Sequence, residues 1–120
     1  MTALIADDSK VMRIMLKGIL TNCGFLTIHE ATDGDIAVEL YTKTKPDIVT
    51  LDITMGKCDG IEALKQIIKA DPGAKVLMIS STGQDIVVRD AIKSGASGFI
   101  VKPFTPDQVS AAIKKMLSTN

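Results

Sequence analysis

Short runs of apolar residues alternate along the chain with longer segments in which apolar residues recur at helical spacing. The apolar runs predict five strands, at about residues 3–6, 25–31, 48–52, 75–80 and 98–101. The periodic segments predict five helices, at about residues 10–22, 35–42, 60–70, 84–94 and 106–117. Continuously apolar strands are typical of a parallel sheet that helices cover on both faces. The pattern therefore predicts an α/β protein, and it leaves the strand order open.

Local signals mark where several of these helices begin and end. Gly24 follows the first periodic segment, at the position where glycine commonly ends a helix. Asp59 stands three residues before a glutamate and ahead of an apolar stretch, which indicates a capping box. Thr105, Pro106 and Gln108 combine a cap, a first-turn proline and a capping-box glutamine. These signals fix the last helix most firmly.

Length and composition exclude several classes of protein. A chain of 120 residues suits one domain, so residues 1–120 are expected to form a single unit. Fourteen basic and 14 acidic residues give a net charge of zero, which argues against nucleic-acid binding. No uncharged apolar run approaches the roughly 18 residues of a membrane span. Residues 1–5 lack the length and basic start of a signal peptide, so we expect a cytoplasmic protein with no membrane partner.

Polar residues follow the predicted strands at one edge of the sheet. Asp7 and Asp8 follow the first strand, and Asp52 ends the third. Ser80 ends the fourth strand and Lys102 follows the fifth. Ligands of open α/β sheets bind at this carboxyl edge. Three carboxylates gathered there repel one another, and a single lysine does not neutralise them. The sequence therefore predicts an oxygen-ligand site for a hard cation, for which Mg²⁺ is the natural choice.

The same residues are suited to phosphoryl chemistry. A metal ion between carboxylates recruits a phosphoryl group, and aspartyl phosphates are known covalent intermediates. Asp52, on the central strand, is the candidate nucleophile, while Lys102 and the Ser80 hydroxyl can donate to phosphoryl oxygens. Taken alone, each acid has a structural alternative, since Asp8 suits a helix cap and strand-end aspartates are common in turns. Five such positions together favour a functional site.

The chain resembles the receiver domains of bacterial two-component response regulators, especially those that stand alone in chemotaxis. The resemblance extends from Ala3 to about Leu117 and rests on these motifs: Ile5-Ala6-Asp7-Asp8-Ser9, Pro46-Asp47-Ile48-Val49-Thr50-Leu51-Asp52, Asp59-Gly60, Ile79-Ser80, Gly95-Ala96 and Lys102-Pro103-Phe104. It implies a three-layer, doubly wound (βα)5 flavodoxin-like fold whose parallel sheet has the strand order 2-1-3-4-5. It also implies one receiver domain over residues 1–120.

The resemblance assigns roles to individual residues at the acidic edge. It implies that Asp52 is the phosphoacceptor. It implies that Mg²⁺ is held by the carboxylates of Asp8 and Asp52 and by the backbone carbonyl of Thr54. Asp7 is then expected to reach the metal through a water molecule.

A second group of residues is implied to bind the phosphoryl group and to transmit its presence. Ser80 and Lys102 would contact the phosphoryl oxygens, and Phe99 would be the aromatic switch residue. The Lys102–Pro103 bond matches one that is cis in the family, which is a rare and selected feature. Thr54 and Thr82, each two residues after a site residue, are expected to tune the phosphate lifetime. The chain departs from the family at Phe99, where tyrosine is usual, and at Gly56, where proline is usual.

The implied function is that of a signalling protein rather than an enzyme acting on a separate substrate. It would receive a phosphoryl group from a sensor histidine kinase with Mg²⁺, and it would promote only its own phosphorylation and dephosphorylation. It would then switch a protein-binding face. Further partners implied are a flagellar motor switch protein or a phosphatase, and a monomer is expected.

Other functions stay open at this point. A flavodoxin-like electron carrier has the same fold, but Asp7 and Asp8 would repel the flavin phosphate that its first loop must bind. An aspartate-nucleophile phosphohydrolase would require an acid at position 54, where Thr54 stands. The chain could also be a receiver fragment of a longer regulator, or a phosphate sink that passes on no signal.

Overall fold

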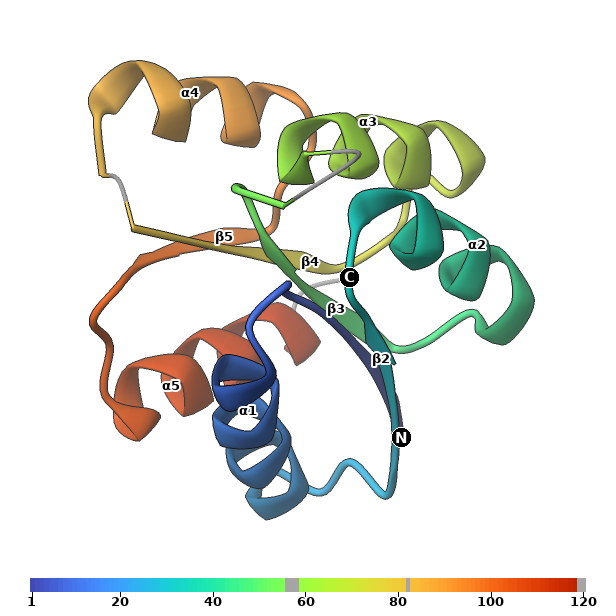
Figure 1. The fold of residues 1–120 in the computed structure, drawn as a ribbon, viewed down its shortest axis with the longest axis vertical. Helices are drawn as coiled ribbons and strands as arrows, with labels where there is room; N and C mark the ends of the chain where they lie inside the picture. Colours follow the sequence, from blue (N-terminus) through green and yellow to red (C-terminus); the bar gives the residue numbers. More distant parts are fainter. Residues whose placement is uncertain (56–58, 82, 119–120) are drawn as a thin grey trace.

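The computed structural model of the protein describes residues 1–55, 59–81 and 83–118. Within them, five parallel strands form one sheet in the order β2-β1-β3-β4-β5, as the resemblance implied (Figure 1). The strands are β1 (Thr2–Ala6), β2 (Thr27–Ala31), β3 (Ile48–Asp52), β4 (Val76–Ser80) and β5 (Gly98–Val101). The α/β fold predicted from the hydrophobic pattern is therefore confirmed.

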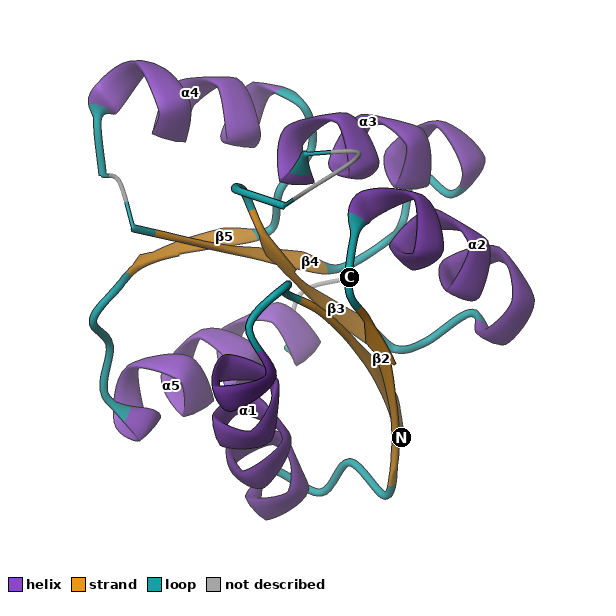
Figure 2. Cartoon of the chain, in the orientation of Figure 1, coloured by secondary structure: helices purple, strands orange, loops and turns teal. Residues whose placement is uncertain are grey.

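Helices cover the sheet on both faces, which makes three layers (Figure 2). The helices are α1 (Lys10–Asn22), α2 (Gly34–Thr44), α3 (Gly60–Ala70), α4 (Asp85–Lys93) and α5 (Pro106–Leu117). Helices α1 and α5 lie on one face, and α2, α3 and α4 lie on the other (Figure 1). None of the helices in the described part of the chain has the length and apolar character that a membrane crossing needs.

Each face of the sheet has its own hydrophobic core. Leu16 of α1 and Ile113 of α5 pack with Ile5 on one side, and Leu64 of α3 and Tyr41 of α2 pack on the other. All residues of β3 and β4 are buried, because helices cover these central strands on both faces. This burial accounts for the continuous apolar runs from which the two strands were predicted.

Some element boundaries differ from those predicted. Strand β2 begins at Thr27 rather than near residue 25. Phe25 is buried in the core beneath α1 and α5, whereas the next residue, Leu26, is almost fully exposed. Helix α2 begins at Gly34 and continues to Thr44, because the Asp33 side chain caps it by accepting from the amide of Ile36 at 2.9 Å. It is therefore longer than the predicted segment at both ends.

The predicted helix caps next to the site are present. The Asp59 side chain accepts from the amide of Glu62 at 2.8 Å and caps α3. Thr105 and Gln108 form a reciprocal capping box at the start of α5, with Pro106 in its first turn. The Lys102–Pro103 bond is cis, as the resemblance implied. These caps set where the two loops that leave β3 and β5 join their helices.

Candidate functional site

The first part of the site is the loop between β1 and α1. Asp7 is buried directly after β1, and its amide donates to the carbonyl of Ala31 on β2 at 3.1 Å. One carboxylate oxygen of Asp7 accepts from the amide of Ser9 at 2.9 Å. Ser9 in turn caps α1 by accepting from the amide of Met12. Asp8, between them, is exposed to solvent, so the loop presents one buried and one exposed carboxylate.

The second part of the site is the end of β3. Asp52 is only 6 % exposed, and its Oδ1 accepts from the amide of Thr54 at 3.3 Å. The loop after Asp52 returns close to the strand, where the amide of Gly60 donates to the carbonyl of Ile53 at 2.8 Å. A Cβ atom at Gly60 would overlap the backbone carbonyl of Asp52. Only glycine therefore allows α3 to start so close to the acidic residue.

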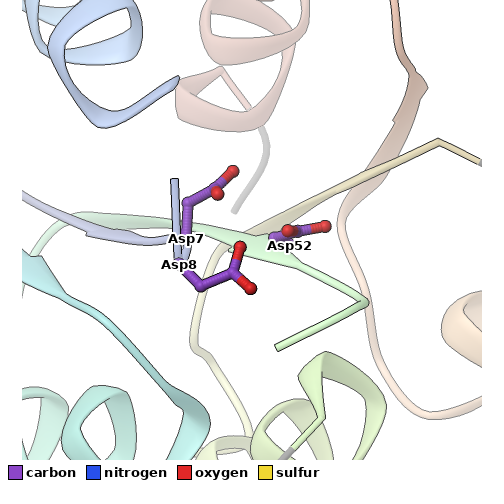
Figure 3. Close-up of side chains that lie close together, drawn as sticks. All are labelled: Asp7, Asp8 and Asp52. Carbon is purple, nitrogen blue, oxygen red and sulfur yellow. The ribbon is translucent and has the colours of Figure 1, made fainter. Parts of the chain in front are cut away.

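The carboxylates of Asp7, Asp8 and Asp52 gather at the ends of β1 and β3 (Figure 3). One oxygen from each lies within 4.8 Å of the other two. The sequence predicted this cluster from three strand-end positions on one sheet edge, and the geometry confirms that the residues meet. Three oxygen ligands at this spacing suit a hard divalent cation.

Lys102 supplies positive charge next to both Asp7 and Asp52. Its Nζ lies 3.3 Å from Oδ2 of Asp7 and 3.6 Å from Oδ2 of Asp52. Its backbone amide donates to the carbonyl of Ser80 at 2.7 Å, which ties the loop after β5 to the end of β4. The lysine therefore bridges the two buried acids at a fixed place.

The electrostatic balance at the site favours a further cation. Burial raises the pKa of Asp52 above its ordinary value of 3.8, and the neighbouring charge of Asp7 raises that pKa further. Lys102 and the Thr54 amide act in the opposite direction, and Asp8 adds a smaller upward effect. The net direction is upward, and burial is its largest cause. Three carboxylates with one lysine beside them still leave an excess of negative charge when all are ionised. A bound Mg²⁺ would supply the missing charge, and the donor set fits that ion.

The other predicted site residues lie close to this cluster along the chain or on neighbouring strands. Ser80 is fully buried at the end of β4, and Val101 of β5 is its register partner. Phe99 on β5 is partly buried and packs against the core beneath α2, α3 and α4. Thr54 is exposed two residues after Asp52, while Thr82 lies outside the described residues. The roles of these four residues stay predictions.

One residue contacts the site although no motif predicted a role for it. Arg13, on α1, donates from Nη1 to the backbone carbonyl of Asp7 at 2.7 Å. Its position one helical turn after the cap residue Ser9 is the only sequence signal, and that spacing alone does not distinguish a surface arginine from one that folds back.

Comparisons with known proteins agree with this geometry. The family model of the response regulator receiver domain matches residues 3–114. CheY of Thermotoga maritima is 52% identical over 113 residues, which cover 94% of both chains. CheY of Listeria monocytogenes is 54% identical over 112 residues, covering 93% of this chain and 94% of its own. A solved CheX–CheY–BeF3–Mg²⁺ complex from Borrelia burgdorferi superimposes with a TM-score of 0.93 at 42% identity, over 97% of this chain and 88% of that one.

The chain therefore belongs to the response regulator receiver domain family. Within that family it is a CheY-like receiver domain of a two-component response regulator, with chemotaxis relatives about half identical to it over nearly the whole chain.

Proposed function

We propose that this receiver domain accepts a phosphoryl group on Asp52 from a phosphohistidine of a sensor kinase and then switches a protein-binding face. The observation that carries the proposal is the position of Asp52. It is a buried carboxylate that meets the carboxylates of Asp7 and Asp8, and the Lys102 ammonium lies 3.6 Å from it and 3.3 Å from Asp7. A nucleophile in such surroundings needs cationic help before it can meet a phosphoryl group.

The residues that would hold Mg²⁺ are the carboxylates of Asp8 and Asp52 and the backbone carbonyl of Thr54, with Asp7 acting through water. The ion would offset the negative charge of the acids and of the incoming phosphoryl oxygens. The clustering of three carboxylates and the upward shift in the pKa of Asp52 support this assignment.

The transfer exchanges one bond for another. A carboxylate oxygen of Asp52 forms a bond to phosphorus as the phosphorus–nitrogen bond of the phosphohistidine breaks. The imidazole keeps the electron pair of that bond and takes a proton from solvent when it leaves. The Lys102 ammonium donates to one phosphoryl oxygen and the Ser80 hydroxyl to another, and such charge-assisted bonds form only when the phosphoryl group is present.

These bonds are the basis of the proposed switch. A phosphoryl group shifts a conformational equilibrium only if the two conformations bind it differently. In the proposed switch, Ser80 moves toward Asp52 to donate to the phosphoryl group, and the Phe99 ring turns inward into the space that Ser80 leaves. The face that responds is then formed by α4, β5 and α5.

The relatives support a chemotaxis role with protein partners. Membership of the receiver family supports a histidine kinase as donor. We propose a flagellar motor switch protein or a phosphatase as a further partner. The Borrelia complex, in which CheX is bound to a CheY, supports direct protein binding.

We further propose one receiver domain over residues 1–120 that acts in the cytoplasm as a monomer. Its activity is limited to its own phosphorylation and dephosphorylation, with Thr54 and Thr82 setting the lifetime.

The test is to phosphorylate the protein with acetyl phosphate and Mg²⁺ and to map the adduct by mass spectrometry. The adduct is expected on Asp52, and Asp52→Asn should abolish it. Asp85→Asn, which removes an exposed acid of α4 that is not part of the cluster, is the matched control and should be labelled like the wild type. An adduct of equal yield in the Asp52→Asn variant would overturn the assignment.

A further inference from the structure

Arg13 is held in an unusual way for an arginine near a protein surface. Its side chain is only 13% exposed, although arginine is mostly found exposed. The side chain turns back from α1, and Nη1 donates to the backbone carbonyl of Asp7 at 2.7 Å. The short distance is that of a charge-assisted hydrogen bond. The guanidinium is therefore hydrogen-bonded to the backbone of a residue in the acidic cluster.

A second contact fixes the other side of the same guanidinium. Nε of Arg13 lies 3.2 Å from Oε1 of Glu30 on β2. Because the guanidinium is planar, the bond at Nε sets the direction in which Nη1 points. Lys17 also approaches Glu30, at 3.9 Å from the other oxygen, but it is half exposed and makes the longer contact. Arg13 therefore links β2 to the loop between β1 and α1.

The carbonyl that Arg13 holds belongs to the peptide between Asp7 and Asp8. The other bonds of Asp7 involve its amide, which donates to Ala31, and its carboxylate, which accepts from Ser9 and Lys102. Arg13 adds a bond on the side of the peptide that leads to Asp8. Asp8 is exposed, and the position of its Cα depends on how this peptide is oriented. Fixing the peptide plane therefore limits the positions from which the Asp8 carboxylate can approach Asp52.

We propose that Arg13, anchored by Glu30, is a positioning residue that aligns the Asp7–Asp8 peptide for metal binding. This inference rests on the proposed function of the acidic site. Groups that orient metal ligands from behind commonly change metal affinity by about 10- to 100-fold when they are lost. Arg13 acts one step further away, through a backbone carbonyl, so we expect a loss of affinity near the lower end of that range.

The competing interpretation is that Arg13 only fastens α1 to β2. In that case its loss would lower the thermal stability of the metal-free protein and leave the affinity for Mg²⁺ unchanged. The two interpretations differ in the measured dissociation constant, which describes the folded protein alone. Melting temperature without metal and Mg²⁺ affinity are therefore measured on the same variants.

The experiment compares Arg13→Met with Lys17→Met. Both variants lose one positive charge and one partner of Glu30, but only the first loses the bond to Asp7. Mg²⁺ alone is titrated into each full-length protein, and amide resonances of the β1–α1 loop report binding. Arg13→Met should weaken Mg²⁺ binding about 10-fold. Lys17→Met should change it by less than about twofold, because exposed ion pairs contribute little.

Two further variants separate geometry from charge. Arg13→Lys keeps the positive charge but lacks the planar fork, so it should restore little of the lost affinity. Glu30→Gln keeps the shape of the anchor but removes its charge, and it should give a smaller loss in the same direction. It also keeps the inference testable if Arg13→Met does not fold.

Each outcome bears on a different claim. If Arg13→Met and Glu30→Gln bind Mg²⁺ like Lys17→Met, or if Arg13→Lys restores wild-type affinity, the positioning role is wrong. If the wild type itself binds no Mg²⁺, or carries no adduct on Asp52, the proposed function fails instead. Weakened binding in Arg13→Met, with the adduct still on Asp52, would support both.

Discussion

Two strand–helix pairs on either side of β4, namely β3 with α3 and β5 with α4, are packed to different degrees. Every residue of β3 is buried, and α3 beside it buries Leu64 and Ile67. The residues of β5 are only partly buried or exposed, and Ala91 is the residue that α4 buries. Asp52 stands at the end of the firmly packed strand. Phe99 and the start of α4 lie in the more loosely packed part.

This difference separates the site from the region proposed to respond to it. Close packing leaves few alternative arrangements, so β3 and α3 can hold Asp52 at a fixed place. Helix α4 keeps Ile86 and Ile92 exposed, and an apolar groove lies between it and Ile61 of α3. An element with few buried contacts rearranges at low cost. The molecule thus holds Asp52 in a closely packed region and has a more loosely packed region, α4 and β5, that can move.

The largest expected effect is a difference in stability between two isoleucine truncations, one in α3 and one in α4. Ile67 is fully buried in α3, so Ile67→Ala should lower the free energy of unfolding by about 2–5 kcal/mol. Ile86 is 75% exposed on α4, and Ile86→Ala should change the free energy of unfolding by no more than about 0.5 kcal/mol. Urea unfolding of both variants measures the difference. Equal losses would show that α4 packs as firmly as α3.

Gly60→Ala should have the next largest effect, and it tests the support beneath Asp52. The added methyl group would overlap the backbone carbonyl of Asp52, and such overpacking costs about 1–3 kcal/mol of stability. The displaced loop should also slow phosphorylation of Asp52. Gly18→Ala is the matched control, because an added Cβ there meets no atom within 4 Å.

Gly18 lies inside α1, where alanine is favoured over glycine by about 0.5–1 kcal/mol. The control should therefore be more stable than the wild type and should be phosphorylated at the same rate. If Gly60→Ala retains wild-type stability and rate, the close approach of α3 to Asp52 does not support the acceptor.

A smaller effect should appear in how stability depends on pH in the absence of metal. Burial and the charge of Asp7 raise the pKa of Asp52, so the folded state holds this proton more tightly than the unfolded state does. The contribution of Asp52 to stability is therefore present below its ordinary value of 3.8 and is lost as the pH rises through the raised pKa. Asp52→Asn should raise the melting temperature at neutral pH, and the gain should vanish at acidic pH.

In excess Mg²⁺ we expect the wild type, rather than Asp52→Asn, to have the higher melting temperature. A ligand that binds only the folded state stabilises it by mass action, so Mg²⁺ should raise the melting temperature of the wild type. The Asp52→Asn variant lacks one of the proposed ligands and should respond less. Thermal denaturation in a chelator and in excess Mg²⁺ measures both effects. A wild type whose melting temperature is the same in the two buffers would contradict the metal site.

The sequence predicted most of the helices and strands, but not all of their limits and not the strand order. The continuously apolar runs predicted β3 and β5 with the observed limits, and cap residues such as Thr105 predicted where α5 begins. Strand β2 was predicted too long, because an apolar residue such as Phe25 can enter the core from a loop as well as from a strand. The strand order came from the family resemblance, since hydrophobic periodicity does not determine which strands are neighbours.

The acidic cluster could be predicted because parallel strands bring their carboxyl ends to one edge. The contact of Arg13 with Asp7 could not, because it depends on the direction that a long side chain takes. Glu30, which sets that direction, lies on β2 and is 17 residues away from Arg13 in the sequence. Spacing along the chain predicts which residues share an edge or a helix face, but not which side chain crosses between elements.

The finest test of the contrast is the response to beryllofluoride, a mimic of the phosphoryl group, added with Mg²⁺. Ser80 is fully buried at the end of β4, and β5 beside it is less buried, so the proposed movement of Ser80 toward Asp52 should be accompanied by a movement in β5. Amide chemical shifts should therefore change at the site, at residues 80–84 and at residues 99–105. Those of residues 63–70 in α3 should change little, because this part of the helix is firmly packed. If the changes stay confined to Asp7, Asp8 and Asp52, the protein accepts phosphate without passing a signal to this face, and a phosphate sink becomes the better interpretation.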